Sequence, residues 1–261
     1  MAGIEDREHH KGAGVPSTAR PSIYELREPA IDLGAWLDAD LPALRDARVL
    51  DAGCGPGSYV PAVSARAAWL VAFDIAHRRL ADHVDATLAS RACGDVQSLP
   101  FTDDAFDAAM AMHMLYHVPD IPAAVGELRR VVRDGGVLYA LTNSERAQWE
   151  LAELLDRNGC DPSAGGDFGS LRFSNENGAA LLATAFADVV LHEDTRHRLV
   201  VRDPECIVDE IVRNRYIYEP GLRAGVTWDD LVDAVRRDVT AVIEREGAFV
   251  MSENHGLFTC R

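Results

Sequence analysis

The chain of 261 residues is 48% hydrophobic and 26% charged, which is ordinary for a globular protein of one or two domains. Its formal net charge of −16 disfavours a nucleic-acid partner, because an acidic surface repels phosphate. Lys11 is the only lysine, which excludes a lysine Schiff base or a phosphate-loop lysine in the rest of the chain, and the scattered cysteines predict neither a disulfide framework nor a zinc site.

No segment predicts membrane insertion or secretion. No apolar run approaches the roughly 20 residues that span a bilayer. Residues 1–20 are polar and glycine-rich, without the apolar core of a signal peptide. We therefore expect a disordered leader over residues 1–20, a cytoplasmic protein and no membrane partner.

Strands and helices are predicted to alternate through the first half of the chain. A helix over residues 21–41, with Pro29 as a break, precedes strands at residues 48–52, 69–73, 88–92, 105–112 and 137–141 and helices at residues 58–67, 76–85 and 121–132. The strands are apolar on both faces, which predicts a parallel sheet covered by helices on both sides. Because ligands of such sheets bind at the carboxyl ends of the strands, the residues that follow each strand are the candidates for a site.

The second half departs from this alternation. Helices are predicted at residues 144–158 and 174–186. Two more are predicted from their caps: one with Asp203 as cap and Pro204 at its first position, and one that begins after a capping box at Thr227. Strands are expected at residues 188–191, 199–201, 249–251 and 256–260, with residues 199–201 pairing with the continuation of the first of these. We interpret the inserted helices as a lid in a single domain of residues 21–261. Its core is expected at residues 45–142 and 187–261, and its lid at residues 21–41, 143–186 and 203–246.

A glycine-rich turn follows the strand at residues 48–52. It reads Asp51-Ala52-Gly53-Cys54-Gly55-Pro56-Gly57. Glycine has no Cβ and tolerates positive φ, so a ligand can lie against the backbone and meet the free N–H groups of a helix start. The turn departs from the dinucleotide pattern G-x-G-x-x-G, because residue 58 is serine and the third glycine comes one residue early. By itself the turn selects no ligand.

The motifs that follow the later strands indicate which ligand the glycine turn binds. After the glycine turn come Asp74, then Gly94-Asp95-Val96 with Leu99-Pro100-Phe101, and then Phe106-Asp107 at the start of an apolar strand. Over roughly residues 49–142 this series resembles class I S-adenosylmethionine (SAM)-dependent methyltransferases, more narrowly the ubiquinone/menaquinone-biosynthesis type, the "type 11" methyltransferase domain. The resemblance implies an α/β, Rossmann-like, doubly wound and mostly parallel seven-stranded sheet with helical lid insertions, and SAM as the cofactor.

The resemblance also implies roles at the glycine turn. The backbone of Gly53, Cys54 and Gly55 approaches the methionine end of SAM, with Cys54 as a small filler of the loop. Asp51 shapes the loop and favours the cationic end of the cofactor. The backbone at Met112 faces the methionine amino group.

Further implied contacts reach the nucleoside. Asp74 binds the ribose hydroxyls and Ile75 packs on the adenine. Asp95 accepts from the adenine amino group, with a turn or helix cap as its alternative role, and the Val96 N–H donates to the ring. Tyr24 and Arg27, on the first predicted helix, either cover the glycine turn or form a solvated surface pair.

Candidate catalytic residues follow the strand at residues 105–112. His113 and His117 can each take a proton from a hydroxyl, phenol or amine, and Tyr116 can orient the acceptor. A role for His117 in bracing the loop stays open. His255, between the last two strands, is an outside candidate whose alternative is a hairpin turn.

These features predict a SAM-dependent methyltransferase that modifies an O, N or C atom of a small-molecule acceptor, secondary metabolites among the candidates. No metal is indicated, and a homodimer is a candidate assembly. The alternatives are a SAM-binding enzyme of the same fold with another reaction, an RNA methyltransferase, a dinucleotide enzyme and a nucleotide-binding module without catalysis. The acceptor is expected to be selected by the lid.

Overall fold

The computed structural model describes residues 20–164 and 172–261, which form two compact units. One unit contains residues 31–145, 172–194 and 255–261. The other contains residues 20–30, 146–164 and 195–254. The predicted leader, apart from Arg20, lies outside the described residues, as do residues 165–171 between two of the predicted helices.

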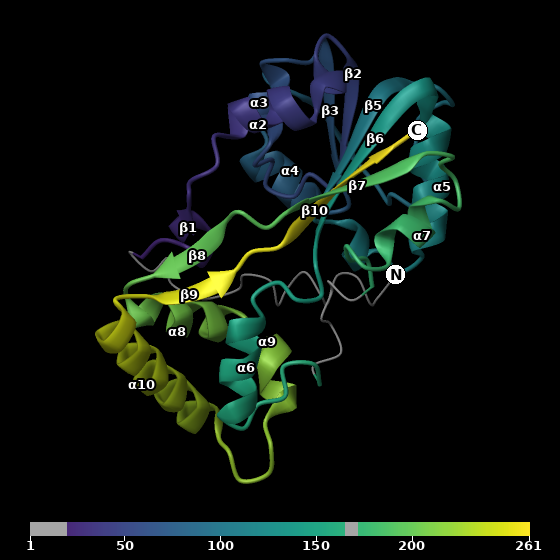
Figure 1. Cartoon of the computed structure of the whole chain (residues 1–261). Coiled ribbons are helices and arrows are strands. Elements are labelled where there is room, and N and C mark those ends of the chain that lie inside the picture. The colour runs from purple at the N-terminus through teal and green to yellow at the C-terminus, as the bar shows by residue number, and fades with distance from the viewer. Residues whose placement is uncertain (1–19, 165–171) are drawn as a thin grey trace. The chain divides into compact units, whose positions relative to one another are not determined.

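A seven-stranded sheet forms the first unit (Figure 1). Its order is β4 (Ser90–Cys93), β3 (Trp69–Asp74), β2 (Arg48–Ala52), β5 (Phe106–Met112), β6 (Val132–Asn143), β10 (His255–Cys260) and β7 (Val189–Asp194). The first five strands are parallel, and β10 is antiparallel to both of its neighbours. The doubly wound, mostly parallel seven-stranded sheet predicted from the sequence is confirmed.

Helices cover both faces of this sheet. The side chains of β2 alternate between two cores: Val49 packs into the core with α2 (Leu33–Asp40), α3 (Val60–Ser64) and α4 (His77–His83), whereas Leu50 packs into the core with α5 (Ile121–Val131) and α7 (Gly178–Leu182). A strand that is apolar on both faces is stable only between two such layers, because successive side chains point to opposite sides.

The motif residue Asp107 stabilises the sheet at the opposite end from the carboxyl edge of β5. Its carboxylate accepts from the backbone N–H of Arg48 at 2.8 Å and from Arg133 Nε at 2.7 Å. The side chain of Arg48, together with that backbone N–H and Arg133, holds the pKa of Asp107 well below its usual range. Asp107 therefore ties the starts of β2, β5 and β6 together and leaves their carboxyl ends for ligands.

The second unit contains a three-stranded antiparallel sheet (Figure 1). Its order is β1 (Arg27–Glu28), β8 (Arg198–Val201) and β9 (Phe249–Ser252). The helices of this unit are α6 (Trp149–Arg157), α8 (Pro204–Arg213), α9 (Arg215–Tyr218) and α10 (Trp228–Glu246). The predicted caps are confirmed: Asp203 accepts from the N–H of Glu205, and Thr227 forms a capping box with Asp230.

Two expectations about these segments are wrong. Residues 21–41 do not form one helix: Ile23–Leu26 is a 3₁₀ turn, Arg27 pairs with Leu199 in the small sheet, and only α2 is α-helical. Pro29 lacks an N–H and disfavours helix in the residue before it, which accounts for the break. Residues 199–201 do not pair with the strand after residue 188, because β8 joins β1 and β9 instead.

Other helices are shorter than predicted, as expected for ends that fray. The helix expected at residues 144–158 is α6, and that expected at residues 174–186 contains α7. None of the helices among the described residues is long and apolar enough to cross a bilayer. The extents proposed for core and lid in a single domain stay a prediction.

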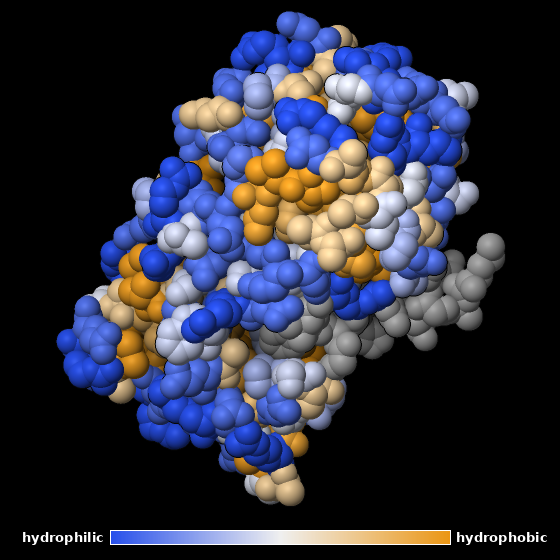
Figure 2. Space-filling model, turned by 45° about the vertical axis from the view of Figure 1, so that its right-hand side comes forward, coloured by the Kyte–Doolittle hydropathy of each residue, from blue (hydrophilic) through white to orange (hydrophobic). Residues whose placement is uncertain are grey.

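The surface is mostly polar (Figure 2), in keeping with the net charge of −16. Eight large apolar side chains of the described residues are exposed: Tyr24, Trp69, Ile75, Leu88, Trp149, Val190, Val212 and Val250. Most stand singly in the sequence, which is normal for a soluble surface. Ile75 differs from the others because it follows a strand at the predicted ligand edge.

Candidate cofactor and acceptor site

The glycine turn depends on glycine for its backbone geometry. Gly53, Gly55 and Gly57 have φ of 68°, 54° and 74°, a region that other L-residues adopt at a cost. At Gly53 a Cβ would also lie 2.8 Å from the Met114 side chain. The segment that follows β5 therefore packs against the glycine turn that follows β2, and it leaves no room for a larger residue there.

Asp74 is bound to the same turn. One carboxylate oxygen accepts from the Gly55 N–H and the other from the Ala76 N–H, both at 2.8 Å. The carbonyl of Phe73 accepts from the N–H groups of Gly53 and Cys54 at 2.7 and 3.0 Å. The end of β3 thus holds the turn in place and presents a carboxylate beside it, as the predicted ribose contact requires. Ile75 is 46% exposed and available as an apolar platform.

Asp51 lies in β2 just before the glycines, in a different environment. It is 1% exposed, and neither carboxylate oxygen has a hydrogen-bond partner among the described residues. Burial, and to a smaller extent the nearby Asp74 charge, raises the pKa of Asp51 to about 7. Burial also raises the pKa of the neighbouring Cys54 thiol, which makes this cysteine a packing residue without thiolate character.

Asp95 and Val96 follow β4, as predicted. The Asp95 carboxylate accepts from the backbone N–H of Gln97 at 2.9 Å and from its Nε2 at 2.8 Å, which is the geometry of a local turn. The Gln97 side-chain oxygen in turn accepts from the Asp120 N–H. Val96 is buried. Asp95 therefore has the turn role that was its alternative. Contact of Asp95 and Val96 with adenine stays a prediction.

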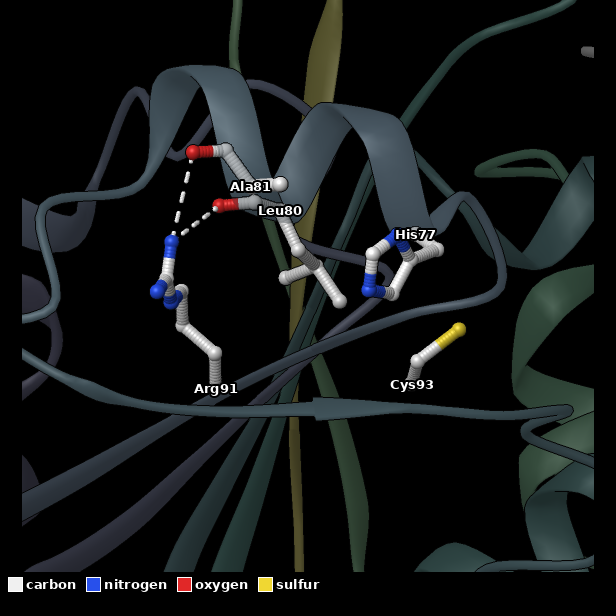
Figure 3. A pocket seen from close by; sticks show the side chains of 5 residues that line it. All are labelled: His77, Leu80, Ala81, Arg91 and Cys93. Carbon is white, nitrogen blue, oxygen red and sulfur yellow. Dashed lines mark hydrogen bonds between the residues drawn. The ribbon is translucent and has the colours of Figure 1, made fainter.

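A cavity of about 250 Å³ lies between α4 and β4 (Figure 3). Its lining residues are His77, Leu80, Ala81, Arg91 and Cys93, none of which is a predicted site residue. Arg91 donates to the carbonyls of Leu80 and Ala81 at the end of α4, so its guanidinium serves as a helix cap. The Cys93 thiol donates to the Ile75 carbonyl. This cavity is thus a neighbour of the predicted adenine contact and is smaller than typical ligand pockets.

The residues after β5 are those predicted to face the acceptor. His113 has φ of 53°, and its N–H donates to the Leu141 carbonyl of β6 at 2.9 Å. Its ring contacts that of His255 with the centroids 5.3 Å apart and the planes at 70°. The rings of Tyr116 and His117 contact each other with their centroids 4.5 Å apart. Of the two predicted bases, His117 is more exposed than His113. A non-glycine residue in the left-handed region next to a ligand edge is often functional.

His255 is only an outside candidate from the sequence, and its place in the sheet explains why. His255 is the first residue of β10, and its register partners are Asn143 at the end of β6 and Asp194 at the end of β7. Because β10 runs antiparallel to β6, its beginning lies at the carboxyl edge of the parallel strands. No local signal in the sequence marks an antiparallel strand inserted at that point. The hairpin-turn alternative is wrong, since His255 begins a strand.

Tyr24 and Arg27 lie in the second unit. Arg27 forms a two-pronged ion pair with Glu253, which is 1% exposed, and the Tyr24 hydroxyl accepts from Gln148 Nε2 at 3.4 Å. The pair is therefore not simply a solvated one, because Arg27 is held by a buried carboxylate. Their predicted placement over the glycine turn stays a prediction.

Residues 50–140 match the family model of a methyltransferase domain. That stretch contains the glycine turn, Asp74, Asp95 and the segment after β5. This stretch of the chain is therefore a methyltransferase domain. Among its curated relatives, a malonyl-[acyl-carrier protein] O-methyltransferase of Erwinia pyrifoliae is 34% identical over 114 residues, which are 43% of each chain. A demethylmenaquinone methyltransferase of Mycobacterium marinum is 35% identical over 121 residues, 44% of this chain and 52% of the relative.

The chain spans about half the length of these curated relatives. Solved structures match a larger share of this chain than the curated relatives do. A structure described as a candidate methyltransferase of an antibiotic biosynthesis pathway in Anabaena variabilis has a TM-score of 0.60 at 17% identity and covers 88% of this chain and 96% of its own. A candidate methyltransferase of Bacillus halodurans has a TM-score of 0.57 at 20% identity and covers 88% and 98%. At these identities the likeness shows the fold alone.

The residues of the methyltransferase domain fit its cofactor. SAM carries a sulfonium and an ammonium. The site offers two carboxylates: that of Asp51 is buried and receives no hydrogen bond from the described residues, and that of Asp74 is held by the glycine turn. No group of three or more histidine, cysteine, aspartate or glutamate side chains among the described residues is arranged to hold a metal ion.

Proposed function

We propose that this protein transfers the methyl group of SAM to an O, N or C atom of a small-molecule acceptor. The observation that supports this most directly is the bond between Asp74 and the glycine turn at 2.8 Å. This bond holds a carboxylate beside a backbone turn that a ligand can approach closely, and in our proposal that carboxylate binds the ribose. The family match over residues 50–140 supports SAM as the occupant.

In this proposal the nucleoside and the methionine end of SAM lie on opposite sides of the turn. Asp74 binds the ribose hydroxyls, and Ile75, Asp95 and Val96 contact the adenine. The backbone of Gly53 and Gly55 approaches the methionine end, as does that of Met112. SAM supplies the methyl group, and the protein has to align the acceptor and keep water out.

We propose His113 ahead of His117 and Tyr116 as the residue that takes the acceptor proton. His113 follows Met112 directly, and the next residue, Met114, packs against Gly53. A hydroxyl acceptor loses its proton to the imidazole as its oxygen attacks the methyl group, and SAM leaves as S-adenosylhomocysteine (SAH). Tyr116 and His117 orient the acceptor or brace the loop.

The curated relatives do not share one acceptor. Their names specify a malonyl group on acyl-carrier protein and demethylmenaquinone, which are chemically different acceptors on similar domains. The domain therefore does not select the acceptor by itself, and we propose that the segments predicted as a lid do so. The net charge of −16 argues against an acceptor as acidic as RNA or acyl-carrier protein.

Two measurements test this function. Thermal unfolding with SAH should give a higher melting temperature, because a ligand at 100 times its Kd adds about 2.7 kcal/mol. NADH at the same concentration should leave the melting temperature unchanged, and the opposite result would favour a dinucleotide enzyme. Extracts incubated with methyl-labelled SAM should then yield a labelled product whose mass has increased by one methyl group. SAM consumption with an unmethylated product would replace methyl transfer by another SAM reaction.

A further inference from the structure

Asp51 is a buried carboxylate that the glycine turn leaves without donors. It is 1% exposed, and neither of its oxygens has a hydrogen-bond partner in the part of the chain that the structure describes. The N–H groups nearest in sequence are already used, since those of Gly53 and Cys54 donate to Phe73 and that of Gly55 donates to Asp74. The turn therefore cannot stabilise a negative charge on Asp51.

The other groups around Asp51 do not stabilise that charge either. On one side β3 supplies the carboxylate of Asp74, which repels it, and the turn supplies the Cys54 thiol. On the other side β5 places Met110 in register with Asp51. No cationic side chain of the described residues contributes to its charge state. A buried carboxyl group with a carboxylate nearby and no donor favours its neutral form, and its pKa is accordingly raised to about 7.

A cationic ligand at the turn would reverse this preference. SAM carries a sulfonium and an ammonium against one carboxylate, whereas SAH lacks the sulfonium charge. A positive charge near a carboxyl group in a low-dielectric site favours its ionised form. We propose that Asp51 makes the glycine-turn site selective for a cationic ligand by holding a proton in the empty site and releasing it to solvent when SAM binds. This inference rests on the proposed function, because it takes SAM to be the ligand of the turn.

Methyl transfer converts the cationic cofactor into neutral SAH, so the reason for Asp51 to stay ionised is lost. Asp51 then takes a proton back from solvent, and the site regains its preference for SAM over SAH. No bond other than the O–H bond of Asp51 changes in this exchange. Asp51 acts as a specificity-determining residue and need not touch the reacting atoms.

Proton release on binding can be measured without an acceptor. Calorimetric titration of the wild-type protein at pH 6 and pH 8, each in two buffers of different ionisation enthalpy, counts the protons released. At pH 6 the amino groups of SAM and SAH are both protonated and do not interfere. We expect release approaching about one proton for SAM at pH 6, little at pH 8, and clearly less for SAH at pH 6. Sinefungin, which carries an ammonium in place of the sulfonium, should behave as SAM does.

The variant Asp51→Asn isolates the group responsible. In the wild type, SAM affinity should rise with pH by up to about tenfold per pH unit below pH 7, the limit for one linked proton. In Asp51→Asn this rise should disappear, and SAM and SAH should release equal numbers of protons. Asp134→Asn, at a side chain that is 96% exposed, is the matched control and should keep the wild-type pH dependence.

The outcomes separate this inference from the proposed function. Equal proton release by SAM and SAH in the wild type would overturn the role of Asp51 and leave SAM binding intact. Persistence of the SAM-specific release in Asp51→Asn would also overturn it. Failure of the wild type to bind SAM at either pH would overturn the proposed function and this inference together. If Asp51→Asn does not fold, the proton release measured for SAM, sinefungin and SAH in the wild type still tests the role of Asp51.

Discussion

The imidazole rings of His113 and His255 contact each other edge to face, with their centroids 5.3 Å apart. They come from segments that are far apart in the sequence, one directly after β5 and the other at the start of β10. Their contact places two imidazoles at the edge of the sheet where the glycine turn lies. A base that is positioned by a second group is a common arrangement for proton transfer.

Replacement of His113 is expected to slow methyl transfer with little effect on SAM. With the acceptor identified from extracts, His113→Ala should lower kcat by about 10²–10⁴-fold, the usual contribution of a general base. His117→Ala, on the same segment and more exposed, is the matched control and should lose far less. The Kd of SAH, measured by calorimetry, should stay within a few-fold of wild type in both. Equal losses in the two variants would contradict the choice of His113.

His255 is expected to act through His113. His255→Ala should reduce kcat less than His113→Ala and should change the acid side of the pH–rate profile, whereas a purely structural role would lower the yield of folded protein without changing that profile. The double variant should be no slower than His113→Ala alone, because residues that act as a unit are not additive. Additive losses would show that the two histidines act separately.

Removal of the Asp74 side chain is expected to weaken cofactor binding. Asp74→Ala deletes the acceptor of two backbone N–H groups and the predicted ribose contact. Hydrogen bonds to a charged group contribute about 1.5–3 kcal/mol each, so SAH affinity should fall at least about tenfold. Asp85→Ala removes an exposed aspartate that likewise accepts from a local backbone N–H, that of Thr87, and it should leave SAH affinity unchanged. Intact SAH binding by Asp74→Ala would refute the site assignment.

The glycines offer a graded test of the turn. Gly53→Ala combines a φ of 68° with a Cβ 2.8 Å from Met114 and should destabilise the protein most. Gly55→Ala has a φ of 54° but meets no atom within 4 Å, so only the backbone cost of about 1–2 kcal/mol applies. Gly126→Ala, on an exposed position of α5 with open space around it, should stabilise by about 0.5–1 kcal/mol. Chemical denaturation measures all three, and any other order would contradict the described turn.

The buried Asp51 predicts a pH-dependent penalty on stability. Its pKa is raised from its ordinary value to about 7 in the folded state, so the folded protein binds the proton more tightly than the unfolded chain. Stability therefore falls as pH rises from about 4 to about 7, by at most about 4 kcal/mol for this group, and the penalty is complete above pH 7.

Asp51→Asn removes that penalty. Relative to wild type, the variant should gain more stability at pH 8 than at pH 5, as measured by urea denaturation at both values. The difference between the two proteins cancels the titration of other groups, such as Asp107. A gain that is independent of pH would show that Asp51 is ionised throughout this range.

Local patterns in the sequence determined the parallel half of this protein. The apolar strands, the glycine turn and Asp74 are read from consecutive residues, because strand period and glycine geometry are local properties. The family match over residues 50–140 and the observed order of β2, β3 and β5 agree with that reading. Asp203 and Thr227 were likewise read from the short spacing that helix caps require.

Only the tertiary structure decided which distant segments meet. Residues 199–201 joined β1 and β9 because strand pairing depends on long-range packing that no local pattern encodes. The insertion of β10 between β6 and β7 carried His255 to the ring of His113. The backbone N–H groups near Asp51 donate to Phe73 and Asp74 instead, so the Asp51 carboxylate is buried without a hydrogen-bond partner among the described residues. Burial and hydrogen bonding depend on the whole fold, and they determine the charge that Asp51 carries.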